Sequence, residues 1–124
     1  MKHLLAAFLI LISAPSALGE TLACEGEDPF WHLDLRVDAG SATFERTGET
    51  AMSADIALTA LAQGNRSVRA FSLTNMTTGF TGIAVTAPAA CVLGGDESFS
   101  HRVEFLTQAL NEAILLTGCC RASR

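Results

Sequence analysis

The chain has 124 residues and a mass of 13.0 kDa, which suits one domain and is too short for two. It carries 8 Lys and Arg against 13 Asp and Glu, for a formal charge of −5, and this acidic balance excludes a nucleic-acid binder that works by neutralising phosphates. Charged residues make up 17% and hydrophobic residues 49%, which excludes a charge-rich disordered chain.

The first 19 residues have the layout of a secretory signal peptide. Met1-Lys2-His3 is a short basic start, Leu4 to Ile12 is an apolar run without charges, and Ser13 to Gly19 ends on small residues. The apolar run spans about 14 Å as a helix, against a hydrocarbon core of about 30 Å, so we expect no membrane span after cleavage. We expect cleavage after Gly19, which leaves residues 20–124 as a single extracytoplasmic β domain, periplasmic or secreted.

An alternative interpretation makes Cys24 a lipid-modified N-terminus. The small Ala23 before it fits such a site, but Thr21 stands where leucine is preferred. Glu20 also places a charge between the apolar run and the cysteine. These departures disfavour a lipid anchor.

Alternation of apolar and polar residues with a period of two follows the leader and is typical of half-buried β-strands. The expected strands are 30–37, 41–46, 55–61, 67–73 and 80–86. Trp31 and Leu33 are expected on the inward face of the first, and Phe44 on that of the second. In the third, Ile56, Leu58 and Ala60 are expected to share a face. Asp38-Ala39-Gly40 predicts a tight hairpin turn in which Gly40 takes the left-handed conformation.

The last third of the chain is expected to contain one long irregular segment and one hairpin. Pro88 and two glycines predict a loop over 87–100. Residues 101–110 and 113–119 predict two strands, with Val103, Phe105 and Thr107 on one face. A helix over 103–116 is the rival prediction, because this segment is rich in good helix formers. About seven short strands predict an all-β fold, a small disulfide-stapled antiparallel barrel or sandwich.

The four cysteines predict two disulfides, because an even number in a small exported chain is typical of a disulfide framework. Cys119 and Cys120 are neighbours, and in a strand their side chains point to opposite faces. We therefore expect each to have its own partner, so that Cys24 and Cys91 each pair with one of them. The spacing contains no Cys-x-x-Cys motif, which speaks against a metal site.

Two groups of side chains are candidates for a functional site. Phe30 and Trp31 place large rings on opposite faces of one strand. Either they face a ligand, or Trp31 anchors the core and Phe30 covers a strand edge. His32 and Asp34 share a face at the spacing of two metal ligands or of a base and its orienting acid, and His101 could be the third member. Alternating polar residues on a solvated strand give the same pattern, so we assign no catalytic, metal or cofactor site.

The chain resembles a family of uncharacterised bacterial secreted or membrane-associated proteins. The resemblance rests on Cys24 followed by Asp28-Pro29-Phe30-Trp31, on Cys91 followed by a Gly/Asp/Ser-rich segment over 94–98, and on Gly118-Cys119-Cys120 near the end. The family usually has glutamate in place of Asp28 and a Gly-Met-Ser-Asp run after the central cysteine. The resemblance implies a cysteine-bridged β domain outside the cytoplasm and implies no activity.

We therefore expect a non-catalytic binding or interaction module of the bacterial envelope, whose partner is a protein or a small ligand. The alternative is a proteinaceous inhibitor of a secreted, cell-wall lytic hydrolase, for which an acidic surface would suit a basic target. The third hypothesis is a metal- or His/Asp-dependent enzyme that uses His32, Asp34 and His101. No cofactor is expected.

Overall fold

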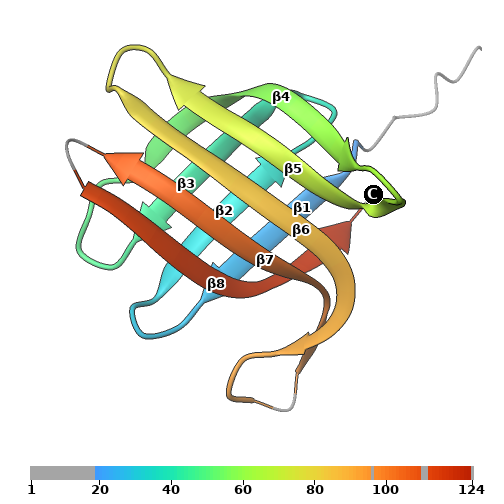
Figure 1. Cartoon of the computed structure of the whole chain (residues 1–124). Coiled ribbons are helices and arrows are strands. Elements are labelled where there is room, and N and C mark those ends of the chain that lie inside the picture. The colour runs from blue at the N-terminus through green and yellow to red at the C-terminus, as the bar shows by residue number, and fades with distance from the viewer. Residues whose placement is uncertain (1–18, 96, 110–111, 124) are drawn as a thin grey trace, which may run out of the picture.

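The computed structural model describes residues 19–95, 97–109 and 112–123, so the predicted signal peptide lies outside the described residues except for Gly19. The described chain forms eight strands that close into an antiparallel barrel in sequence order (Figure 1). They are β1 (Thr21–Gly26), β2 (Trp31–Arg36), β3 (Ser41–Arg46), β4 (Met52–Ala62), β5 (Asn65–Asn75), β6 (Phe80–Val92), β7 (Ser98–Ala109) and β8 (Glu112–Ser123). The predicted all-β class is confirmed, as a barrel, with eight strands in place of about seven.

The strand that the sequence did not predict is β1, which closes the barrel. Its backbone pairs with β2 on one side, where Cys24 faces Leu33, and with β8 on the other, where Cys24 faces Cys120. Thr21 to Gly26 shows no clear alternation, because the apolar Ala23 lies between Leu22 and Cys24, so the local sequence does not predict a strand. Pairing with two neighbours, rather than local sequence, makes this segment extended.

The core lies inside the barrel and is dominated by aromatic rings. Trp31, Phe44, Phe80 and Phe105 are each at most 2% exposed. The rings of Phe44 and Phe105 meet edge to face at 5.0 Å, and those of Phe44 and Phe80 stack at 5.9 Å. The predicted inward faces of β2 and β3 are confirmed, and Gly40 takes the expected positive φ of 70°.

Two glycines make room for the indole of Trp31. A Cβ added at Gly26 would lie 2.0 Å from the indole Nε1, and one at Gly118 would lie 2.8 Å from Cζ2. The Gly118 Cβ would also lie 2.1 Å from the backbone oxygen of Glu25 on the neighbouring strand. Real Cβ atoms do not approach this closely, so both positions require glycine for β1, β8 and the tryptophan to pack together.

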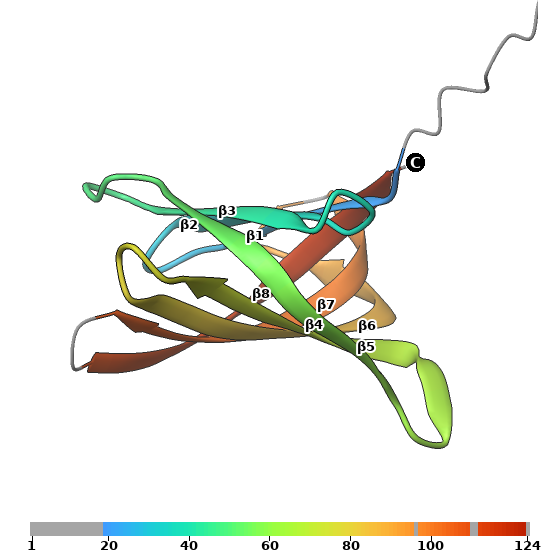
Figure 2. The ribbon, with the colours of Figure 1, turned by 90° about the horizontal axis from the view of Figure 1, so that it is seen from above.

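The predicted inward face of β4 is wrong beyond Ile56. A register shift separates Ile56, which packs against the core, from Leu58, which is 70% exposed. A bulge of this kind turns the following residues to the other face. Beyond it, β4 and β5 leave the barrel as a two-stranded ribbon (Figure 2), in which residues 57–61 and 63–67 are exposed.

Two predictions for the last third of the chain are also corrected. The irregular loop over 87–100 is wrong, because β6 continues to Val92 and β7 starts at Ser98, with a register shift after Pro88 that accommodates the proline. The rival helix over 103–116 is wrong as well. Val103 and Phe105 are buried while Glu104 and Leu106 are exposed, since β7 must pair with both β6 and β8 to complete the barrel.

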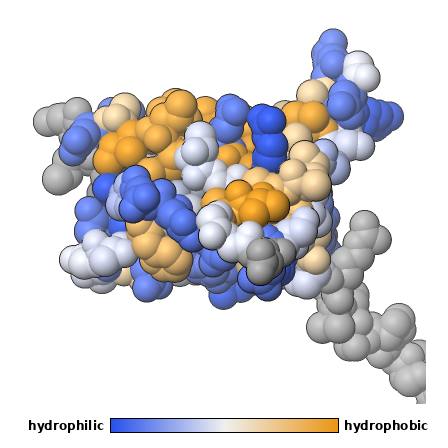
Figure 3. Space-filling view, turned by 90° about the horizontal axis from the view of Figure 1, so that it is seen from below, coloured by the Kyte–Doolittle hydropathy of each residue, from blue (hydrophilic) through white to orange (hydrophobic). Residues whose placement is uncertain are grey.

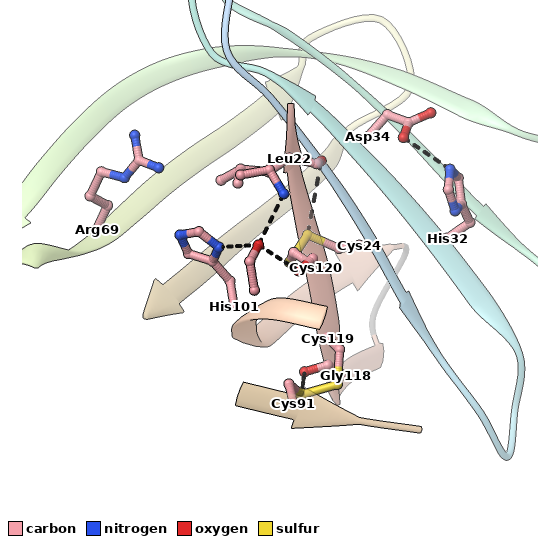
Figure 4. The surroundings of a disulfide bond; sticks show 12 residues. Leu22, Cys24, His32, Asp34, Arg69, Cys91, His101, Gly118, Cys119 and Cys120 are labelled. Carbon is pink, nitrogen blue, oxygen red and sulfur yellow. Dashed lines mark hydrogen bonds and ion pairs between the residues drawn. A yellow bond between two sulfur atoms is a disulfide. The ribbon is translucent and has the colours of Figure 1, made fainter. Parts of the chain in front are cut away.

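The two predicted disulfides are formed (Figure 4). Cys24 pairs with Cys120 across the seam between the first and last strands, and Cys91 pairs with Cys119. Neighbouring cysteines on β8 thus point to opposite faces, one into the barrel and one toward the β6–β7 hairpin. Two disulfides fit an extracellular or periplasmic protein.

Candidate functional site

The two ends of the barrel differ in how they are filled. The β1–β2, β3–β4 and β5–β6 turns lie at one end, where β7 also ends and β8 begins, and we call this end the mouth (Figure 2). The mouth contains a cavity of about 420 Å³. This is within the size range of small-molecule sites, and eight-stranded barrels are wide enough to hold one small ligand.

The mouth cavity has an apolar floor and a polar rim. Four apolar side chains form most of the floor, with the stacked rings of Phe44 and Phe80 at an interplanar angle of 13°. Its lining residues are Phe44, Arg46, Glu49, Thr50, Met52, Thr78, Phe80, Thr107, Glu112 and Ile114. Such a lining favours a ligand that is mostly apolar and carries few polar groups.

Thr107 is the polar side chain at the floor of this cavity. It is 4% exposed, and its Oγ1 has no hydrogen-bond partner among the described residues. Native proteins rarely leave a buried polar atom unpaired, because the lost hydration costs about 1–3 kcal/mol. Thr86 has an equally orphaned hydroxyl at 0% exposure, but it does not line the mouth cavity. Thr107 therefore has hydrogen-bonding capacity that no described residue uses.

The rim of the mouth cavity carries more negative than positive charge. Arg46 Nη1 lies 3.7 Å from Glu49 Oε1, with the two side chains 23% and 53% exposed. Glu112 at the start of β8 adds a second carboxylate to the lining. With one guanidinium and two carboxylates, the described rim has a net charge of −1, and it faces solvent.

The opposite end of the barrel is filled by an ion pair and a histidine. The guanidinium of Arg69 donates to both carboxylate oxygens of Glu20, at 3.0 Å for Oε2. Burial lowers the pKa of His101, and the nearby Arg69 lowers it further, while Glu20 opposes the change. Ser100 Oγ lies 2.8 Å from His101 Nδ1 and also contacts two backbone atoms of β8. These contacts fasten the end of β8 to β7.

The structure does not bring the three predicted metal or acid–base residues together. His32 Nε2 lies 2.9 Å from Asp34 Oδ1 on the outer face of β2. His101 belongs to the inward-facing positions of β7, on the far side of the disulfide from the His32–Asp34 pair (Figure 4). Among the described residues, no group of three His, Cys, Asp or Glu side chains is arranged to hold a metal ion.

The two predicted ligand-facing aromatics do not line the mouth cavity. Trp31 is 1% exposed within the core, and Phe30 is 52% exposed in the β1–β2 turn, where its carbonyl oxygen accepts from Thr47. The residues that line the cavity were not predicted as a site. Thr107, a polar residue at an inward position between Phe105 and the β7–β8 turn, is the signal in the sequence that could have pointed there.

The outer face of the barrel carries a second feature, a row of exposed apolar side chains. Ile83, Leu106 and Leu115 are cross-strand neighbours on β6, β7 and β8, and are 47%, 46% and 63% exposed. Leu58 extends this row, because Leu58 and Ile83 both pair with Ser72. Figure 3 shows apolar surface in several patches with polar surface between them. We call these four residues the outer apolar row.

The β6–β7 hairpin, which contains the segment predicted as a loop, presents a mixed surface. Val92 is 60% exposed, whereas the carboxylate of Glu97 is paired with the guanidinium of Arg121. No helix in the described part of the chain is long and apolar enough to cross a membrane.

No protein-family model, curated protein or solved structure matches this chain.

Proposed function

We propose that the protein is a non-catalytic binding module of the cell envelope and that its ligand occupies the mouth cavity. The observation that carries this proposal is that the buried hydroxyl of Thr107, a residue that lines this cavity, has no hydrogen-bond partner among the described residues. A ligand atom placed there would gain a hydrogen bond that the ligand-free protein leaves unmade. The aromatic floor would bind the apolar body of the same ligand.

The experiment is a fluorescence titration of the purified protein with N-phenyl-1-naphthylamine, a probe whose emission rises in apolar sites. Ile114 lines the mouth cavity, so Ile114→Phe fills part of it. The matched control is Leu115→Phe, at the next residue of β8 but on the outer face. We expect saturable binding that Ile114→Phe weakens at least several-fold and Leu115→Phe leaves unchanged. No saturable binding, or equal loss in both variants, would contradict the proposal.

A second candidate function is the inhibition of a secreted, cell-wall lytic hydrolase, and the outer apolar row favours it. Exposed rows of this kind on a barrel wall are suited to burial against a protein surface. The formal charge of −5 would attract a basic hydrolase. Hydrolysis of peptidoglycan by a basic muramidase should slow when the protein is added. Leu106→Glu should abolish this effect and Thr43→Glu, on the outer face of β3, should not; no inhibition by the unaltered protein would refute this function.

We further propose that the protein is exported and cleaved after Gly19. The signal-peptide layout of residues 1–19 and the two disulfides support this. The backbone nitrogen of Glu20 already lies 2.9 Å from Asp38 Oδ2, so cleavage at this bond would place the new ammonium group against a carboxylate. N-terminal sequencing of the exported protein should start at Glu20. An exported chain that retains Met1 would contradict the proposal.

A further inference from the structure

The mouth cavity has two polar features at different depths, and together they restrict its ligand. Thr107 pairs with Ile114 across the β7–β8 ladder, and Glu112 lies two residues from Ile114 toward the rim. Two residues of strand rise by about 7 Å. A hydrogen-bonding group at the floor is thus separated by about this distance from a charged group at the rim.

The group at the floor of the site must be uncharged. Its polar partner is a single neutral hydroxyl, which can donate one hydrogen bond and accept others. The surrounding floor is formed by Phe44, Phe80, Met52 and Ile114. An ionised group buried among these side chains would lose its hydration without gaining a charged partner. A hydroxyl, carbonyl or amide group meets the requirement.

The charges at the rim favour a cationic group of the ligand over an anionic one. Arg46 is 3.7 Å from Glu49, so the one guanidinium of the described lining is already near a carboxylate. Glu112 leaves the rim with an excess of one negative charge. The side chain of Glu49 is 53% exposed, so the attraction for a cation is screened by solvent and is modest.

We infer that the mouth cavity binds a small cationic amphiphile, an apolar chain with a neutral hydrogen-bonding group at its buried end and an ammonium group at the rim. This inference rests on the proposed ligand-binding function of the cavity and adds the chemical class of the ligand. The excess of one negative charge at the rim disfavours anionic amphiphiles such as fatty acids.

The test compares three matched small molecules by NMR titration of the isotope-labelled protein. They are 6-amino-1-hexanol, which has both groups; hexylamine, which lacks the hydroxyl; and 6-hydroxyhexanoate, which has the opposite charge. We expect 6-amino-1-hexanol to bind about 5-fold more tightly than hexylamine, from one neutral hydrogen bond. We expect it to bind about 5-fold more tightly than 6-hydroxyhexanoate, from the exposed rim charges.

Two pairs of variants separate the contributions of the floor and the rim. Thr107→Val should remove the preference for 6-amino-1-hexanol over hexylamine. Thr86→Val removes an unpaired hydroxyl outside the cavity and should preserve this preference. Glu112→Gln should reduce the preference over 6-hydroxyhexanoate, whereas Glu104→Gln, on the outer face of β7, should not. Equal binding of all three molecules, or tighter binding of the anion, would overturn the inference. Binding of N-phenyl-1-naphthylamine that Ile114→Phe still weakens would then leave the proposed function standing with another ligand class.

Discussion

Replacing Thr107 by valine should stabilise the ligand-free protein. Threonine and valine have nearly the same shape, Thr107 is 4% exposed, and its hydroxyl is buried and unpaired. A buried, unpaired polar group costs about 1–3 kcal/mol, and the substituted methyl adds apolar burial. We therefore expect the free energy of unfolding to rise by about 1–2 kcal/mol, which in a domain of this size raises the melting temperature by roughly 4–16 °C.

The assay is urea unfolding followed by the fluorescence of Trp31, the only tryptophan in the chain. Thr86→Val provides the matched comparison, because the Thr86 hydroxyl is also buried and unpaired. It should stabilise by a similar amount. Thr117→Val, at an exposed position of β8, should change the free energy of unfolding by less than about 0.5 kcal/mol.

Only one of the two stabilising substitutions should affect binding. Thr107→Val should lower the affinity for a ligand that hydrogen-bonds to Thr107, whereas Thr86→Val should leave this affinity unchanged. A Thr107→Val protein that is at least 1 kcal/mol less stable than the unaltered protein would refute the reasoning. Such a loss would mean that the hydroxyl has a partner in the ligand-free state.

Three further predictions concern the stability of the barrel. Replacing both Cys91 and Cys119 by alanine removes a link across a sequence separation of 28, which should lower the free energy of unfolding by about 3.5 kcal/mol in the chain-entropy model; an unchanged urea midpoint would contradict this. Gly118→Ala places a Cβ 2.1 Å from a backbone oxygen of β1, so it should destabilise by about 3 kcal/mol or more, and calorimetry showing an unchanged melting temperature would count against the close packing. Burial, and then Arg69, lower the pKa of His101 below its ordinary value of 6.5, so the unfolded chain binds more protons and stability falls as the pH drops through 6.5. His101→Gln should flatten the stability profile between pH 7 and pH 5, and a slope equal to that of the unaltered protein would refute the assignment.

The two ends of the barrel differ in how they are stabilised. The end that contains the Glu20–Arg69 pair also carries the termini, and the Cys24–Cys120 disulfide joins the first and last strands there. The mouth, in contrast, contains a cavity of about 420 Å³, whose lining includes Thr107 with its unpaired hydroxyl. Local departures from the packing rules are common at functional sites, and this supports the proposal that a ligand binds at the mouth.

The sequence by itself determined the all-β class, most strands and the need for separate partners of Cys119 and Cys120. These features follow from local rules: alternation with a period of two places residues on opposite faces of a strand, and adjacent cysteines therefore cannot face the same way. The hairpin around Gly40 was predictable for the same reason, because its turn type depends on residues that are adjacent in the chain.

Tertiary structure decided what depends on residues distant in the sequence. β1 is a strand because β2 and β8 flank it, and Leu58 is exposed because a register shift precedes it. His32 and His101 do not form one site, because His32 lies on the outer face of β2 and His101 belongs to the inner face of β7. The mouth cavity is formed by side chains from five strands and two turns, and closure of the barrel is what brings these segments together. Local patterns show which face a residue takes but not which strands surround it.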